Sequence, residues 1–286
     1  MENCCVNSPV NPAVLHFQAI TEQLCGFEIS SQEVSRATKA LDEELQAWRK
    51  RSLGRMLYLI VDARYEKVRR NGTVSDSSVL IAHGIDEEGR RRVLGVSVSL
   101  SESEVHWRGF FDGLVSRGLH GLKLIVSDAH SGLKAARQAV FPSVPWQRCQ
   151  FHLQQNAQAY VPKKSMKSAV ALDIRSILNA PDRMEADRLL GKMVEKYKSN
   201  APELSIWMES NIPESLEVMS LPQPHWKKLR TSNMAERVNK EVKRRTKVVG
   251  IFPNVDACLR LCTAMLVEQD EEWQEGRTYL NMDTSN

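Results

Sequence analysis

The sequence has few cysteines, no long apolar run and little net charge. Its six cysteines are too sparse and irregularly spaced for a disulfide framework in a chain of 286 residues. The N-terminus lacks the basic residues and apolar stretch of a secretory signal, and the best apolar run, residues 57–61, is too short to cross a membrane. No internal repeat or low-complexity tract is present. These absences predict a cytoplasmic protein without a membrane partner.

The composition is that of a globular protein, and its charge is unevenly distributed. Hydrophobic residues make up 42% and charged residues 26%, which argues against disorder. The net charge is only +4, but residues 227–247 hold nine basic residues against two acids, a local charge of +7. A positive excess confined to one short stretch predicts a polyanionic partner. The basic residues are Lys227, Lys228, Arg230, Arg237, Lys240, Lys243, Arg244, Arg245 and Lys247.

Part of this basic segment forms a stripe on a predicted helix. Arg237, Lys240, Arg244 and Lys247 follow one another at spacings of three, four and three. Such a stripe can neutralise phosphates along a nucleic acid. A solvated charged face is the alternative interpretation, and the scarcity of compensating acids weakens it.

The N-terminal part of the chain is predicted to be helical. Ser30 and Glu33 have the spacing of a capping box, and apolar residues at helical spacing continue to Trp48. A shorter helix is expected over residues 17–24. The two helices could form a helix-turn-helix or a plain helical hairpin.

The middle of the chain alternates between strand and helix patterns. Asn71-Gly72 predicts a hairpin turn, and Ser101 with Glu104 predicts a capping box. Strands are expected over residues 57–61, 79–85, 93–100, 122–126 and 144–146, and helices over residues 101–114, 130–140, 151–160 and 255–273. Residues 163–220 show helical spacing without convincing strands. The order predicts an α/β protein with a mixed sheet flanked by helices.

Three acids are candidates for a metal-dependent site. Asp62 and Asp128 each follow an apolar strand, and active sites of open α/β sheets gather at the carboxyl ends of strands. If the two strands are neighbours, the carboxylates face one another and favour a shared Mg²⁺ or Mn²⁺ ion. Glu236 is the third candidate because it lies within the basic stretch. The alternatives are turn-starting aspartates and a helix cap formed by Asn233 with Glu236.

Cys149 and His152 have the spacing of half a zinc site. Cys258 and Cys262, four residues apart on a predicted helix, could complete it, although their pattern suits core packing equally well. We interpret Cys149 and His152 as a buried, satisfied pair rather than as zinc ligands.

Together these residues resemble the Mutator-like family of bacterial insertion-element transposases. The resemblance extends from about residue 25 to Leu280 and includes several separate motifs in order. They are Leu59-Ile60-Val61-Asp62-Ala63, Val126-Ser127-Asp128-Ala129-His130-Ser131-Gly132-Leu133, Trp146-Gln147-Arg148-Cys149-Gln150-Phe151-His152, Ser232-Asn233-Met234-Ala235-Glu236-Arg237-Val238-Asn239 and Lys243-Arg244-Arg245-Thr246-Lys247-Val248-Val249-Gly250-Ile251-Phe252-Pro253-Asn254.

The resemblance implies a ribonuclease H-like fold and a DDE triad. By this similarity Asp62, Asp128 and Glu236 are the catalytic residues and would hold two Mg²⁺ or Mn²⁺ ions. Cys149 and His152 would be structural or would contact DNA. The implied partner is double-stranded DNA, at the terminal inverted repeats of the element and at the target, bound by a homo-oligomer near the bacterial nucleoid.

The resemblance also implies a division of the chain into four parts. Residues 1–54 would be a helical N-terminal remnant for DNA binding or dimerisation, and residues 55–162 the first part of the catalytic core. Residues 163–222 would be an all-helical insertion, and residues 223–286 would complete the core with the basic helix.

Family members carry a longer N-terminal region that recognises the inverted repeats, and we expect most of it to be absent here. Two alternatives to an active transposase therefore stay open. One is a truncated, inactive protein that binds DNA or inhibits transposition. The other is a separate ribonuclease H-like nuclease or resolvase.

Overall fold

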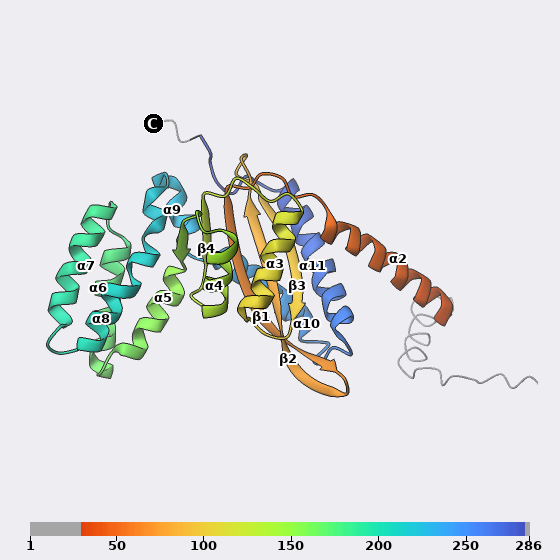
Figure 1. Cartoon of the computed structure of the whole chain (residues 1–286), viewed down its shortest axis with the longest axis horizontal. Coiled ribbons are helices and arrows are strands. Elements are labelled where there is room, and N and C mark those ends of the chain that lie inside the picture. The colour runs from red at the N-terminus through yellow and green to blue at the C-terminus, as the bar shows by residue number, and fades with distance from the viewer. Residues whose placement is uncertain (1–29, 284–286) are drawn as a thin grey trace, which may run out of the picture. The chain divides into compact units, whose positions relative to one another are not determined.

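The computed structural model describes residues 30–283 (Figure 1). The chain divides into two compact units between Trp48 and Arg49. Helix α2 (Ser31–Lys50) begins with the predicted capping box. The amide of Ser30 donates to a carboxylate oxygen of Glu33 (2.8 Å), and the amide of Glu33 donates to Oγ of Ser30 (3.2 Å). The helix predicted over residues 17–24, and with it the choice between helix-turn-helix and hairpin, lies outside the described residues.

The centre of the second unit is a five-stranded mixed sheet. Its strands are β1 (Tyr58–Arg70), β2 (Thr73–Ile85), β3 (Arg91–Ser99), β4 (Leu124–Ser127) and β5 (Trp146–Arg148). The order across the sheet is β3-β2-β1-β4-β5. The pairs β1–β2 and β2–β3 are antiparallel, whereas β1–β4 and β4–β5 are parallel. This arrangement confirms the predicted mixed α/β sheet and is consistent with a ribonuclease H-like fold.

The first hairpin is longer than the sequence pattern predicted. Asn71 (φ 49°) and Gly72 (φ 81°) form its two-residue turn, as expected for Asn-Gly. The strands continue in register from Tyr58↔Ile85 to Arg70↔Thr73. Their outer halves are polar and largely exposed. The apolar pattern identifies only the halves of the two strands that are buried in the core. The outer halves are held together by backbone hydrogen bonds rather than by burial of apolar side chains, so no apolar pattern marks them.

Helices cover both faces of the sheet (Figure 1). Helices α3 (Glu104–Ser116) and α4 (Ser131–Val140) lie on one face, where buried side chains of β1 and β4 pack against Trp107, Phe111 and Leu133. Helices α10 (Asn233–Thr246) and α11 (Val255–Glu275) lie on the other face. The capping box predicted at Ser101 and Glu104 is wrong. Helix α3 begins at Glu104 after Ser103, whose side chain makes no capping hydrogen bond.

The segment between β5 and α10 is helical. It contains α5 (Gln150–Ala157), α6 (Lys167–Leu178), α7 (Arg183–Tyr197), α8 (Pro202–Asn211) and the short α9 (Gln223–Leu229), with four 3₁₀ turns. The described residues 163–222 contain no strand, as predicted. Side chains from Leu153 to Leu216 form a hydrophobic cluster separate from the one between the sheet and α3–α4. This segment therefore has a core of its own.

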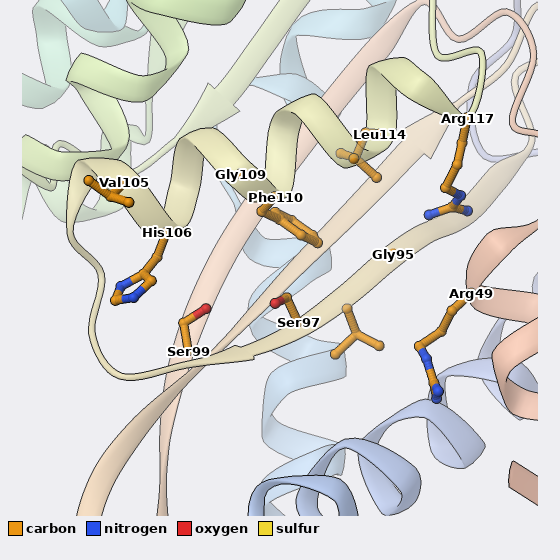
Figure 2. Close-up of a pocket in the computed structure, with 12 residues that line it drawn as sticks. Arg49, Gly95, Ser97, Ser99, Val105, His106, Gly109, Phe110, Leu114 and Arg117 are labelled. Atoms are coloured by element: carbon orange, nitrogen blue, oxygen red, sulfur yellow. The ribbon is translucent and has the colours of Figure 1, made fainter.

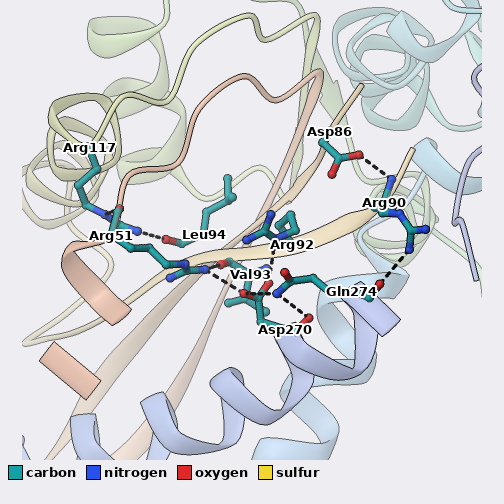
Figure 3. Close-up of polar contacts among 9 residues, drawn as sticks. All are labelled: Arg51, Asp86, Arg90, Arg92, Val93, Leu94, Arg117, Asp270 and Gln274. Atoms are coloured by element: carbon teal, nitrogen blue, oxygen red, sulfur yellow. Dashed lines mark hydrogen bonds and ion pairs between the residues drawn. The ribbon is translucent and has the colours of Figure 1, made fainter. Parts of the chain in front are cut away.

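A buried carboxylate ties α11 to the edge of the sheet (Figure 3). The side chain of Asp270 is only 2% exposed. It accepts hydrogen bonds from the amide of Val93 (2.8 Å) and from the guanidinium of Arg51 (3.1 Å), and Arg92 lies at 3.4 Å. Burial lowers the pKa of Arg51 to about 10, opposed by the charge of Asp270. Because the carboxylate is surrounded by charged and amide donors, it is held in the position that fixes α11 against β3.

Candidate active site

Asp62 lies within β1, and Asp128 directly follows β4, the parallel neighbour of β1. Ile60 of β1 pairs with Val126 of β4, and each aspartate is two residues beyond this pair, Asp62 within β1 and Asp128 just after the end of β4. Side chains alternate along a strand, which places Asp62 on the face opposite Leu59 and Val61. That is the face covered by α10. The prediction that Asp62 directly follows the first strand is wrong, because β1 continues to Arg70 and Asp62 lies within it.

Asp62 is a half-buried carboxylate held by two hydrogen bonds. Its Oδ1 accepts from the amide of Ala63 (3.0 Å), and its Oδ2 accepts from the side-chain amide of Asn239 (2.7 Å). Burial raises the pKa of Asp62 to about 6, and the negative charge of Asp128 contributes in the same direction. The two hydrogen bonds and nearby His152 oppose this rise in pKa. Asp62 and Asp128 are therefore close enough to repel one another, as expected of neighbouring carboxylates.

Glu236 lies in the first turn of α10. Its Oε1 accepts a hydrogen bond from Oγ of Ser232 (2.9 Å), and its side chain is 31% exposed. The cap that we considered for Asn233 is absent, because Ser232 is the N-cap and Asn233 is the first helical residue. The helix also carries Asn239, three residues after Glu236, on the side that faces Asp62.

His152 lies among the predicted catalytic carboxylates. Its Nε2 is 3.9 Å from Oε1 of Glu236. The adjacent side chain of Cys149 raises the pKa of His152 to about 9, with further contributions from the charges of Glu236 and Asp128. Burial acts to raise the pKa of Cys149, but hydrogen bonds from His152 and Ser232 outweigh it and lower that pKa overall. Each of the two groups therefore favours the charged form of the other.

One potential metal-binding group stands out among residues 30–283, and it is not the predicted triad. Ligand atoms of Cys149, His152 and Glu236 all lie within 4.8 Å of one another. Cys258 and Cys262 are buried in α11 and do not belong to this group. The convergence of Asp62, Asp128 and Glu236 on metal ions stays a prediction.

The donor chemistry of Asp62 and Asp128 fits a hard divalent cation. Both offer carboxylate oxygens, and each side chain is half-buried. Their mutual repulsion contributes to the raised pKa of Asp62, and a cation between them would relieve it. Oxygen ligands of this kind suit Mg²⁺ or Mn²⁺.

Two residues near these carboxylates were missed in the sequence. Asn239 is one, and its position in the same motif as Glu236, three residues further along the helix, was the available signal. Glu102 is the other. Burial raises the pKa of Glu102, the charge of Asp128 adds to the rise, and His130 and a hydrogen bond with Tyr65 oppose it. The incorrect cap at Ser101 and Glu104 obscured Glu102.

Most of the basic residues are on the surface, but they are not equivalent. Arg230 is half-buried and donates to Asn179 (2.8 Å). Arg244 and Arg245 pair with Glu241, which lowers the pKa of Glu241 to about 2. Within the described part of the chain, Lys240, Lys243 and Lys247 form no ion pair, so their charges are available to a ligand.

Other predicted DNA-binding residues line a cavity of about 640 Å³ between α9, α10 and α11. Lys227, Lys228 and Arg237 are joined there by Arg91, which the sequence did not single out. The Arg91 guanidinium lies over the rings of Trp273 (4.5 Å) and Tyr279 (4.8 Å). Asn233, Arg237 and Glu241 recur every four residues and face this cavity, so it lies on a different side of α10 from Glu236.

A further cavity, of about 380 Å³, lies between β3 and α3, where Phe110 of α3 faces Ser97 of β3 (Figure 2). None of the predicted site residues lines it. The candidate active site is therefore the surface around Asp62, Asp128, His152 and Glu236.

The mixed sheet flanked by helices is consistent with a protein of the ribonuclease H-like class. The chain matches the family model of transposases of the Mutator family over residues 13–276. It therefore belongs to the Mutator family of transposases, which confirms the resemblance recognised in the sequence. Transposases of this kind cleave DNA and transfer its strands.

Relatives of this chain are transposases of bacterial insertion sequences. It is 54% identical over 264 residues to the transposase for insertion sequence element IS406 of Burkholderia multivorans, which is 92% of this chain and 68% of that protein. It is 44% identical to the transposase for ISRM5 of Rhizobium meliloti, over 93% of this chain and 67% of that protein. The IS256 transposase of Staphylococcus aureus is 35% identical, over 92% of this chain and 68% of that protein. This chain thus spans about two thirds of their length.

No helix within residues 30–283 has the length and apolar character needed to span a membrane.

Proposed function

We propose that this chain is a DDE transposase, in which Asp62, Asp128 and Glu236 hold divalent metal for DNA cleavage at element ends and strand transfer into target DNA. The observation that supports the proposal is the pairing of β1 with β4, because Asp128 follows β4 closely enough for its charge to act on Asp62. Family membership supports the DNA-cleaving activity.

Each residue of the site has a distinct role in this proposal. Two bound Mg²⁺ or Mn²⁺ ions would supply the charge stabilisation that activates water and the leaving 3′-oxygen. Asp62 and Asp128 provide carboxylate oxygens from the rigid sheet, and Asn239 orients Asp62 and favours its charged form. Ser232 holds the carboxylate of Glu236 by a hydrogen bond. His152, with a pKa of about 9, is positively charged at neutral pH and partly balances the three carboxylates.

The basic side of α10 would position the DNA. Lys240 and Lys243 lie on α10, the helix that also carries Glu236, and Lys247 follows its last residue, so phosphates bound by these unpaired charges would be held along the helix that supplies a carboxylate. We propose double-stranded DNA as the ligand, at the inverted repeats of the element and at the target, with a homo-oligomer assembled on it in the bacterial nucleoid.

A labelled element-end duplex with Mg²⁺ tests the proposal. Strand nicking is expected with the wild type and is expected to be lost in Asp62→Asn, Asp128→Asn and Glu236→Gln. Asn239→Ala is expected to lower the nicking rate about 10–100-fold, as for other outer partners of metal ligands. Glu241→Gln is the matched control, because this exposed acid lies on the same helix but pairs with Arg244 and Arg245.

The contrary results identify the alternatives. DNA binding without Mg²⁺-dependent nicking would refute the enzyme and support an inactive DNA-binding inhibitor of transposition. Nicking that survives all three carboxylate substitutions would refute the triad.

A further inference from the structure

The group formed by Cys149, His152 and Glu236 joins the beginnings of two helices. Cys149 precedes α5, His152 lies in its first turn, and Glu236 lies in the first turn of α10. The backbone holds the two helix starts together, because the amide of Ser232 donates to Sγ of Cys149 (3.4 Å) and the amide of Gln150 donates to the carbonyl of Arg230 (3.0 Å). The three side chains are therefore brought together by the fold rather than by chance contact at the surface.

The geometry and the atom types suit a metal ion other than Mg²⁺. The ligand atoms all lie within 4.8 Å of one another, and Nε2 of His152 is 3.9 Å from Oε1 of Glu236. Bonds of about 2.0–2.3 Å to tetrahedral Zn²⁺ require only a small contraction of this group. A sulfur and an imidazole nitrogen favour Zn²⁺, whereas Mg²⁺ takes oxygen ligands.

Two further observations support a ligand at this position. Nδ1 of His152 is buried without a hydrogen-bond partner, although buried polar atoms are normally satisfied. Cys149 is completely buried but its sulfur is next to Glu236, which is 31% exposed, so an ion could reach the group from the side of Glu236. We propose that Cys149, His152 and Glu236 form a Zn²⁺ site with an open fourth position.

This site shares a residue with the proposed catalytic centre. The consequence for activity rests on the proposed function, in which Glu236 serves the Mg²⁺-dependent reaction. When Glu236 binds Zn²⁺ together with Cys149 and His152, its carboxylate is no longer available to the metal ions held by Asp62 and Asp128. Zn²⁺ therefore inhibits the Mg²⁺-dependent reaction by occupying Glu236.

Cobalt binding tests the site without reference to activity. Co²⁺ stands in for Zn²⁺ and gives a thiolate-to-metal charge-transfer band in the near ultraviolet. The full chain is used with Ser at Cys4, Cys5 and Cys25, which lie outside the described residues. This protein should show the band and lose it on addition of Zn²⁺. Cys149→Ser should lack the band, whereas Cys258→Ser, a change at another fully buried free cysteine, should retain it.

A second variant guards against a folding defect in Cys149→Ser. Glu236→Gln keeps the sulfur and the imidazole and changes a partly exposed side chain, so it should retain the band and bind Co²⁺ at least tenfold more weakly. Absence of the band in the protein with Cys149 intact would overturn the proposal. So would persistence of the band in Cys149→Ser, or unchanged Co²⁺ affinity in Glu236→Gln.

The inhibitory consequence is measured in the nicking assay with Mg²⁺. The Zn²⁺ concentration for half-inhibition should rise at least tenfold in Cys149→Ser relative to the wild type, each compared with its own activity without Zn²⁺. Equal sensitivity of the two proteins would overturn the inhibitory role. If the chain does not nick DNA, the proposed function fails while the cobalt result still decides the zinc site.

Discussion

Replacement of Asp62 by Asn is expected to stabilise the metal-free protein. The raised pKa of Asp62, about 6 against an ordinary 3.8, means that the folded state holds its charged form less readily than the unfolded state does. The free energy of unfolding therefore falls as the pH rises through the window from about 4 to 6. At pH 8 the cost of the charged carboxylate is present in full, and the neutral amide of the Asp62→Asn variant would remove it.

The size of the effect follows from the contacts of Asp62. A rise of about two pKa units corresponds to about 3 kcal/mol. An Asn side chain presents a single oxygen, so it can accept from the amide of Ala63 or from Asn239 but not from both, and the lost hydrogen bond costs about 1 kcal/mol. A net stabilisation of about 1–2 kcal/mol remains, which should raise the midpoint of thermal unfolding by about 2–8 °C.

Thermal unfolding of the wild type and Asp62→Asn in chelator at pH 8 and pH 5 measures this difference. The stabilisation should shrink or disappear at pH 5, where Asp62 of the wild type is largely protonated, and in saturating Mg²⁺, which we propose binds the wild type at Asp62. Glu241→Gln is the control, because the pKa of Glu241 is shifted in the opposite direction from that of Asp62. Hydrogen bonds with Arg244 and Arg245 lower the pKa of this exposed acid, so removal of its charge should not stabilise the protein. An Asp62→Asn variant that is no more stable than the wild type at pH 8, or equally stabilised at both pH values, would contradict a cost of burying the charged carboxylate.

Four other substitutions test the fold and the DNA-binding surface. Asp270→Ala removes the buried partner of the surrounding guanidinium groups and should lower the free energy of unfolding by about 3–5 kcal/mol in chemical denaturation. A decrease of less than about 1 kcal/mol would contradict this account. Gly132→Ala places a methyl group 2.3 Å from the carbonyl oxygen of Glu102 and should lower the free energy of unfolding by about 1–3 kcal/mol. Gly109→Ala meets open space and should raise the free energy of unfolding by about 0.5–1 kcal/mol. Arg91→Ala should weaken binding to double-stranded DNA and reduce the dependence of log Kd on log salt by about one, and an unchanged salt dependence would exclude a phosphate contact there.

Local patterns in the sequence were sufficient to predict features that depend on contacts between residues close together in the chain. The capping box at Ser30 and Glu33 and the turn at Asn71-Gly72 formed as predicted, because both depend on atoms a few residues apart. Periodicity located the strands, but it missed the polar half of the first hairpin. It also misplaced the start of α3, because the side chain of Ser101 binds His106 rather than the helix amides.

The composition of the candidate site was decided by the sequence, and its arrangement by the tertiary structure. Chain order and residue type were enough to single out Asp62, Asp128 and Glu236, and the recurring motifs were enough to recognise the Mutator family. Only the pairing of β1 with β4 brings the charge of Asp128 close enough to act on Asp62, and only the packing of α10 on the sheet brings Asn239 to Asp62 across 177 positions of sequence. Such contacts depend on strand register and on the rotation of the helix about its axis. Register and rotation are set by the burial of many side chains at once, so no local pattern specifies them.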